Sequence, residues 1–222
     1  MTGGAAHDEA SVLVLISGRG SNMRALIEHG RDGAMGCRVT QVLSDRPDAA
    51  GLRTARELGV PAEAIPAASW TDRAAYDRAL GDAIERRSPA LIAMAGFMRV
   101  LSGEFVARFA GRMLNIHPSL LPKFPGLHTH RRALAAGERE HGATVHFVTE
   151  QLDAGPAVLQ SRIDVRAGED EAGLARRVLD REHLIYPLAV RWYCEGRLRC
   201  RDGRAWFDGA PLAAPLRYED LP

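Results

Sequence analysis

Short apolar runs alternate with amphipathic segments along the first half of the chain. The runs at 11–16 and 91–95 are continuously apolar, which is typical of parallel strands that are covered on both faces. The segment at 72–87 has helical spacing, with an apolar stripe formed by Ala75, Tyr76, Ala79, Leu80, Ala83 and Ile84. With further strands expected at 38–44 and 62–66 and further helices at 23–29 and 49–58, the pattern predicts a doubly wound, mostly parallel α/β sheet with helices on both faces.

The second half continues this pattern without a linker, an internal repeat or a low-complexity segment. Strands are expected at 113–117, 143–148 and 158–165, and a helix at 102–110. A long helix is expected at 171–194, interrupted by Pro187. A terminal hairpin is predicted at 197–208 around Asp202-Gly203, followed by a loose Pro-rich tail from Ala210. The whole chain, 1–222, is predicted to be a single domain.

A glycine-rich turn, Ser17-Gly18-Arg19-Gly20-Ser21-Asn22, connects the first strand to the first helix. Strand, glycine-rich turn and helix together form a cradle in which free backbone N–H groups can hold an anion. Met23 stands where a dinucleotide site needs its third glycine, and the Lys-Ser/Thr pair of a P-loop is missing. The turn is therefore predicted to bind a single phosphate group; a plain tight turn is the alternative.

The stretch around Asn115-Ile116-His117-Pro118 carries the most suggestive chemistry. Pro118 ends the predicted strand, so Asn115 and His117 project from the same face at its carboxyl end, where open α/β sheets bind ligands. An amide that can donate to an oxyanion beside an imidazole that can move a proton indicates acyl transfer. A structural histidine is the alternative. Asp153 could orient His117 and favour its protonated form, but sequence spacing alone cannot bring the two together.

The loop Gly96-Phe97-Met98-Arg99-Val100-Leu101 is apolar apart from one cation. It follows a buried strand at the same edge of the predicted sheet, where such loops often line a binding site. A flat aromatic ligand would suit it. Packing beneath the following helix is the alternative.

Composition and charge argue against several classes of partner and cellular location. Apolar residues make up 46% of the chain and charged residues 26%, and the net charge of +1 favours neither nucleic acid nor an anionic membrane as a partner. No run is long enough to span a membrane, and Met1 to Ala10 does not resemble a signal peptide. Cys37, Cys194 and Cys200 form no metal-type spacing; a Cys194–Cys200 bridge is a minor alternative. These features predict a cytoplasmic protein.

Three rival chemistries remain open at this point. A metal site is disfavoured because no cysteine or acidic residue accompanies the histidines at standard spacing; the candidates are His117, His128, His130, His141 and His146. A serine nucleophile lacks its Gly-x-Ser-x-Gly elbow. A non-catalytic nucleotide-binding module would leave Asn115 and His117 without a role.

Several stretches together resemble the phosphoribosylglycinamide formyltransferase family. They are Leu15 to Asn22, Ala95 to Arg99, Asn115 to Pro122, Lys123 to His130, and Leu152 to Pro156. The resemblance implies a Rossmann-like formyltransferase fold and transfer of a formyl group from 10-formyltetrahydrofolate to the amino group of glycinamide ribonucleotide, in de novo purine biosynthesis. It also implies a tetrahedral intermediate, no metal, and a possible homodimer.

The resemblance also assigns residues. The ribonucleotide would be bound by Gly20, Ser21, Asn22 and Glu182, and catalysis would rest on Asn115, His117 and Asp153. The folate would be bound by Arg73, Met98, Arg99, Val100, Leu101 and Asn115, with the loop at 148–153 completing that wall. The N-terminal half would mainly hold the ribonucleotide, and the C-terminal half would hold the folate and the catalytic groups.

Two residues depart from the pattern of the family, and other functions are alternatives to formyl transfer. Arg19 stands where a small polar residue is expected, and Ala154 where glycine is usual. A formyltetrahydrofolate deformylase, a methionyl-tRNA formyltransferase or a non-catalytic folate-binding or nucleotide-binding protein would be the alternatives.

Overall fold

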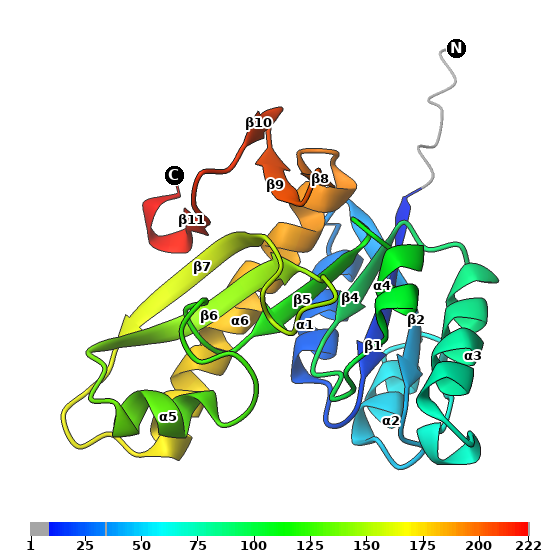
Figure 1. The fold of residues 1–222 in the computed structure, drawn as a ribbon, viewed down its shortest axis with the longest axis horizontal. Coiled ribbons are helices and arrows are strands. Elements are labelled where there is room, and N and C mark those ends of the chain that lie inside the picture. The colour runs from blue at the N-terminus through cyan, green and yellow to red at the C-terminus, as the bar shows by residue number, and fades with distance from the viewer. Residues whose placement is uncertain (1–8, 34, 222) are drawn as a thin grey trace.

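The computed structural model describes residues 9–33 and 35–221 (Figure 1). The expectation about a signal peptide concerns Met1 to Ala10 and so lies mostly outside them. The helices are α1 (Ser21–Arg31), α2 (Ala50–Glu57), α3 (Arg73–Glu85), α4 (Gly103–Arg108), α5 (Thr129–Ala135) and α6 (Glu171–Cys194), with short 3₁₀ turns at Ala67–Ser69 and Tyr218–Asp220. The main strands are β1 (Ala10–Ile16), β2 (Cys37–Ser44), β3 (Ala62–Ala64), β4 (Leu91–Met94), β5 (Met113–His117), β6 (Glu140–Phe147) and β7 (Ala157–Asp164).

The main sheet has the strand order β11-β7-β6-β5-β4-β1-β2-β3, where β11 is Leu216–Arg217. Strands β1 to β5 pair in parallel, and β6 is antiparallel to both of its neighbours. The predicted doubly wound, mostly parallel sheet is confirmed. The chain reverses its direction of travel across the sheet between β1 and β4. In this class of sheet the crevice for ligands opens at the carboxyl ends of the strands at such a point.

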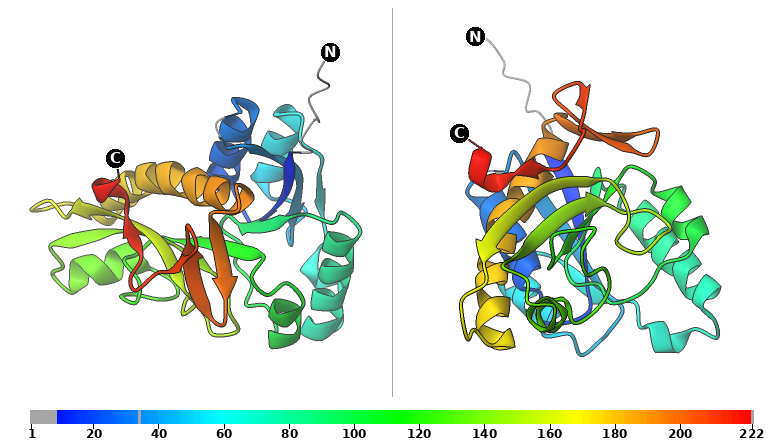
Figure 2. Two further views of the ribbon diagram at one scale, coloured as in Figure 1. Left: turned by 90° about the horizontal axis from the view of Figure 1, so that it is seen from above. Right: turned by 60° about the vertical axis from the view of Figure 1, so that its left-hand side comes forward.

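Both faces of the sheet are covered, as the continuously apolar strands require (Figure 2). Along β1, the side chains of Val12, Val14 and Ile16 belong to a core shared with α1, α2 and α6. The alternate residues Leu13 and Leu15 belong to a second core, shared with α3 and α4. Successive residues of a strand point to opposite faces, so a run of apolar residues fills both cores at once.

The C-terminal segment combines a correct prediction with a wrong one. The predicted hairpin is present as β8 (Leu198–Arg201) and β9 (Arg204–Phe207). The prediction of a loose tail is wrong, because β10 (Ala210–Pro211) pairs with β9, and β11 pairs in parallel with β7. Strand β7 would otherwise present unpaired backbone groups at the edge of the sheet, so the tail covers that edge.

Helix α6 lies against one face of the sheet and contacts β6, β7 and α1. It begins at a cap in which the Asp170 carboxylate accepts a hydrogen bond from the backbone N–H of Gly173, and it continues through Pro187. Its length therefore brings Glu182 beside the start of α1. None of the helices in the described part of the chain is both long and apolar enough to cross a membrane.

Candidate active site

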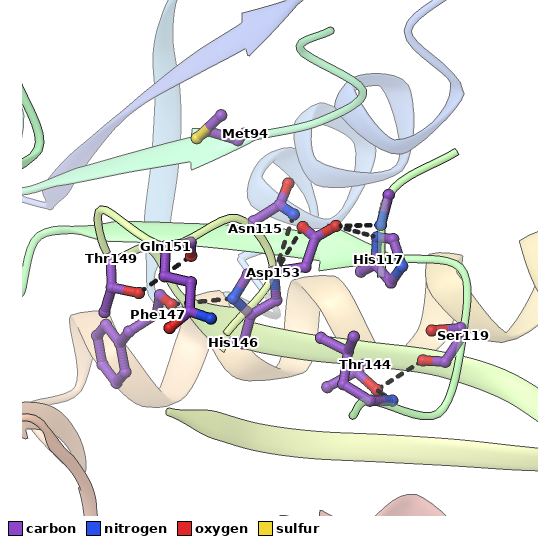
Figure 3. A network of polar contacts seen from close by, with 12 residues as sticks. Met94, Asn115, His117, Ser119, Thr144, His146, Phe147, Thr149, Gln151 and Asp153 are labelled. Carbon is purple, nitrogen blue, oxygen red and sulfur yellow. Dashed lines mark hydrogen bonds and ion pairs between the residues drawn. The ribbon is translucent and has the colours of Figure 1, made fainter. Parts of the chain in front are cut away.

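Strand β5 carries Asn115 and His117 to the carboxyl edge of the sheet, as predicted. A loop that follows β6 brings Asp153 to the same place (Figure 3). The Asp153 carboxylate lies 3.4 Å from Nδ1 of His117, and both side chains are more than nine-tenths buried. The structure thus brings Asp153, which sequence spacing could not connect, to the pair formed by Asn115 and His117.

Asp153 is held from several sides. Its backbone is left-handed, with φ of 51°, and its Oδ2 accepts a hydrogen bond of 2.8 Å from the backbone N–H of Gly126. The loop also passes close to β6 at Gly155, where a Cβ would clash with the carbonyl oxygen of Phe147. Glycine is therefore required at 155, and the carboxylate is fixed before any ligand arrives.

Both ring nitrogens of His117 face acceptors. Nε2 lies 2.9 Å from the carbonyl oxygen of Phe124, and Nδ1 faces the Asp153 carboxylate. A neutral imidazole has a single N–H, whereas the imidazolium has two. Only a ring that carries an N–H on both nitrogens can donate toward both groups at once.

His146 is a part of this network whose role the sequence did not reveal. It lies opposite Asn115 in the β5–β6 pairing and is 2% exposed. Its Nδ1 lies 2.9 Å from the carbonyl oxygen of Phe147, and its Nε2 lies 3.1 Å from Nδ2 of Asn115. Burial lowers the pKa of His146, although the Phe147 carbonyl and Asp153 act in the other direction. The sequence offered this histidine only as a metal candidate, and the register of β5 against β6 was the missing signal.

A pocket opens directly beside these residues. Of the predicted folate residues, Arg99, Val100, Leu101 and Asn115 line it, and the loop at 148–153 forms the opposite wall, as expected. Met98 and Arg73 do not line it: Met98 is 66% exposed, and Arg73 lies 3.9 Å from the buried Asp77 carboxylate. The guanidinium of Arg99 lies over the ring of Tyr76, 4.7 Å from its centroid. The pocket therefore offers an apolar wall, one cation, and the side chains of Asn115, His146 and Asp153.

The predicted phosphate turn lies at the neighbouring strand end. Gly20 adopts φ of 74°, and α1 begins at Ser21 with no acidic residue in its first turn. The first N–H groups of a helix have no partners within it, and they carry the positive end of its dipole. The turn is tied to the apolar loop, because the backbone N–H of Met98 donates to Oγ of Ser17 at 2.8 Å. The two predicted ligand sites thus share one edge of the sheet.

Glu182 reaches this turn from α6. Glu182 is 7% exposed, and Nδ2 of Asn22 donates to its Oε2 at 2.5 Å. Burial raises the pKa of Glu182 to about 7, against the opposing effect of the Asn22 hydrogen bond. An acidic group kept away from water beside an anion cradle is costly to the fold, which is typical of residues retained for binding.

Replacing Glu182 with glutamine should raise the free energy of unfolding at pH 8. The folded-state pKa lies above the ordinary value of 4.5, so the folded chain binds an extra proton between about pH 4.5 and 7. Stability should therefore fall as pH rises through that window and stay low above it. The variant lacks this cost and should be about 1–3 kcal/mol more stable at pH 8, with a smaller difference at pH 5.

Chemical denaturation at both pH values measures this difference. Glu28→Gln is the matched control, because that half-exposed carboxylate on α1 is paired with Arg24. A Glu182→Gln variant with the same stability advantage at pH 5 as at pH 8 would show that ionisation of Glu182 is not the cause.

A larger hollow of about 810 Å³ lies elsewhere, between the loop at 120–123, the turn after α5 and strands β6 and β7. Asn115, His117 and Asp153 do not line it. Its walls carry charges that already pair with one another, Lys123 with Glu138 at 2.7 Å and Arg162 with Glu140 at 3.1 Å. Its size is therefore no guide to the chemistry.

The remaining histidines and the cysteines form no centre of their own. His130 and His141 lie against each other, with Nδ1 and Nε2 3.2 Å apart, and burial lowers the pKa of both. No group of three or more potential metal ligands occurs within residues 9–33 and 35–221. The cysteines Cys37, Cys194 and Cys200 are free, so the Cys194–Cys200 bridge is not formed.

Known proteins are similar to this chain in sequence. The sequence model described as "Formyl transferase" matches residues 10–190. The phosphoribosylglycinamide formyltransferase of Escherichia coli is 48% identical over 202 residues, which cover 91% of this chain and 95% of that protein. The trifunctional purine biosynthetic protein adenosine-3 of Bos taurus is 42% identical over 191 residues, 86% of this chain but 19% of that protein.

Solved structures agree. A phosphoribosylglycinamide formyltransferase of Coxiella burnetii, in complex with CHES, superposes with a TM-score of 0.91 at 42% identity, covering 95% of this chain and 100% of that one. The family predicted from the sequence motifs is thus confirmed at the level of the whole fold. The chain belongs to the formyl transferase family, among the phosphoribosylglycinamide formyltransferases.

Proposed function

We propose that this chain transfers the formyl group of 10-formyltetrahydrofolate to the amino group of glycinamide ribonucleotide, as a single formyl transferase domain in purine biosynthesis. The observation that carries the proposal is that Asn115 and Asp153 line a pocket, with His117 against Asp153, at the sheet edge that also holds the predicted phosphate turn. The names of the relatives support the same reaction.

Each substrate would bind at one of two loops at this edge of the sheet, the turn at 17–22 or the loop at 96–101. The phosphate of the ribonucleotide fits the turn formed by Gly20, Ser21 and Asn22, and the rest of that molecule would contact Glu182. The folate fits the pocket lined by Arg99, Val100 and Leu101, with its formyl group near Asn115. Arg73 and Met98, which lie outside the pocket lining, remain proposed contacts for the outer part of the folate. The reaction calls for no metal.

In the reaction the amine nitrogen attacks the formyl carbon, and the carbonyl oxygen becomes an oxyanion. The Asn115 amide can donate to that oxyanion, and the positive charge of protonated His117, whose two N–H groups face Phe124 and Asp153, stabilises it electrostatically. Collapse of the tetrahedral intermediate breaks the bond to the folate nitrogen. The amine loses one proton and the folate nitrogen gains one, through His117 or a water molecule. Asp153 supplies the counter-charge for His117.

The direct test is a spectrophotometric assay with 10-formyltetrahydrofolate, with and without glycinamide ribonucleotide. Loss of the formyl group that depends on the ribonucleotide would establish the transferase. Deformylation without the ribonucleotide would identify a hydrolase instead, and no turnover in either case would favour a binding role.

Arg19 should strengthen binding of the ribonucleotide. It lies between Gly18 and Gly20 of the phosphate turn, is exposed, and forms no ion pair or side-chain hydrogen bond with the described residues. Arg19→Asn should raise KM for the ribonucleotide about threefold to tenfold with little change in kcat, because an exposed charge acts over a short, screened range. The salt dependence of KM should weaken as well.

Steady-state kinetics at low and moderate ionic strength measure both effects. Arg24→Gln is the control, since Arg24 is an exposed arginine in the first turns of α1 but is paired with Glu28 at 2.7 Å. Equal KM values for Arg19→Asn and the unaltered chain would remove Arg19 from the site.

A further inference from the structure

The Asn115 amide has two orientations, and only one of them suits an oxyanion. With Nδ2 on the side of His146 and Asp153, the amide presents N–H groups to that side. With Oδ1 there, it would present an acceptor that repels the developing negative charge. Figure 3 shows Nδ2 directed toward Asp153 and His146, with Oδ1 turned away.

The tautomer of His146 decides between these orientations. Its Nδ1 lies 2.9 Å from the carbonyl oxygen of Phe147, an acceptor that requires an N–H at Nδ1. A neutral ring protonated at Nδ1 has a bare lone pair at Nε2. That lone pair accepts from Asn115 Nδ2, at 3.1 Å, and would repel Oδ1.

We propose that His146, as a neutral imidazole protonated at Nδ1, is a positioning residue that fixes the Asn115 amide with Nδ2 toward the reacting carbonyl. The inference rests on the proposed function. It assigns His146 no contact with the substrate, only control over which atom of Asn115 the substrate meets.

The surroundings of His146 maintain its neutral form. The titratable groups that face it are Asp153, whose Oδ1 lies 3.8 Å from Nε2, and His117. Asp153 could draw a proton onto Nε2, but its Oδ2 already faces the His117 ring and the Gly126 N–H. Burial of His146 and the neighbouring His117 both oppose a second positive charge. One histidine of the network is thus set up to carry charge and the other to stay neutral.

Substitutions of His146 test whether its Nε2 is the acceptor that orients the Asn115 amide. His146→Leu removes it, and kcat should fall about tenfold to a hundredfold with KM for both substrates changed little, because a small misplacement of a catalytic group has effects of this size. His146→Gln can present a side-chain oxygen near the position of Nε2 and should restore part of the lost kcat. His29→Leu is the control, since that half-buried histidine on α1 also contacts a backbone carbonyl, Ala25 at 2.8 Å, far from the chemistry along the helix.

Nitrogen NMR tests the tautomer without relying on activity. In protein labelled with ¹⁵N-histidine, the His146 resonances, assigned by their loss in His146→Gln, should show a protonated Nδ1 and an unprotonated Nε2 at pH 7. An imidazolium or a ring protonated at Nε2 would overturn the proposal. So would a folded His146→Leu enzyme with unchanged kcat, or a glutamine variant as slow as the leucine one.

These experiments distinguish a folding defect, and a failure of the proposed function, from a failure of the proposal about His146. If His146→Leu fails to fold in a thermal melt, the glutamine variant and the NMR pattern still decide. If the unaltered chain transfers no formyl group, the proposed function fails, whereas the ring nitrogens of His146 still report whether the acceptor exists.

Discussion

Replacing His117 with alanine should lower kcat by about a hundredfold or more while the chain stays folded. The variant loses the positive charge proposed to stabilise the oxyanion and the group proposed to move a proton between the amine and the folate nitrogen. KM values for both substrates should change little, because the phosphate turn and the pocket walls are formed by other residues. Steady-state kinetics with 10-formyltetrahydrofolate and glycinamide ribonucleotide measure the effect.

The structure also predicts how well this variant folds. His117 is 5% exposed, and its removal leaves the Phe124 carbonyl without its ring donor. That carbonyl keeps a second contact, from Oγ of Ser119 at 3.3 Å, so the loss of stability should stay near 1–2 kcal/mol. His128→Asn is the control, because His128 is an exposed loop histidine with φ of 58°, which asparagine tolerates. Turnover that survives in His117→Ala would remove the histidine from the mechanism.

The sheet could be predicted from the sequence because its signal is local. In β1 every residue from Val12 to Ile16 is buried, so the run is apolar throughout and can be recognised without knowing its neighbours. The tail was predicted wrongly for the opposite reason. Leu216 forms a strand only because β7 offers it an unpaired edge, and the partner Leu159 lies far away along the chain. A two-residue strand carries no periodicity of its own.

The candidate site likewise contains residues that local sequence predicts and residues that it does not. Asn115 and His117 are two residues apart on one strand, so their common direction followed from the sequence. Asp153 could be proposed from its Gly-Pro loop, yet its distance from His117 depends on how β6 and β7 return beside β5. The role of His146 depends on the register that places it opposite Asn115. The local sequence pattern therefore identified Asn115 and His117. Strand pairing between distant parts of the chain determines that His146 and Asp153 lie against them.

Arg73 and Met98 illustrate a limit of assignment by resemblance. Both were expected in the folate wall, but neither lines the pocket, whereas the neighbouring Arg99 does. In the loop after β4 the side chain of Phe97 is buried, whereas that of the next residue, Met98, is 66% exposed. Their part in folate binding stays a prediction.

Replacing Asp153 with asparagine should lower kcat by about a hundredfold or more with only a small change in stability. Asparagine tolerates the left-handed backbone at this position, and its side-chain oxygen can still accept from the Gly126 N–H. What the variant lacks is the negative charge 3.4 Å from Nδ1 of His117. Without that charge the His117 ring loses its counter-ion and the partner that orients its Nδ1, so it is less able to stabilise the oxyanion.

The comparison with Asp153→Ala separates charge from structure. Alanine is strained at φ of 51° and leaves the Gly126 N–H without its acceptor, so this variant should lose both activity and about 1–3 kcal/mol of stability. Asp153→Asn should lose activity alone, as measured by kinetics and denaturation on the same samples. An asparagine variant with normal kcat would show that the carboxylate only shapes the loop, and the charge on His117 would then need another source.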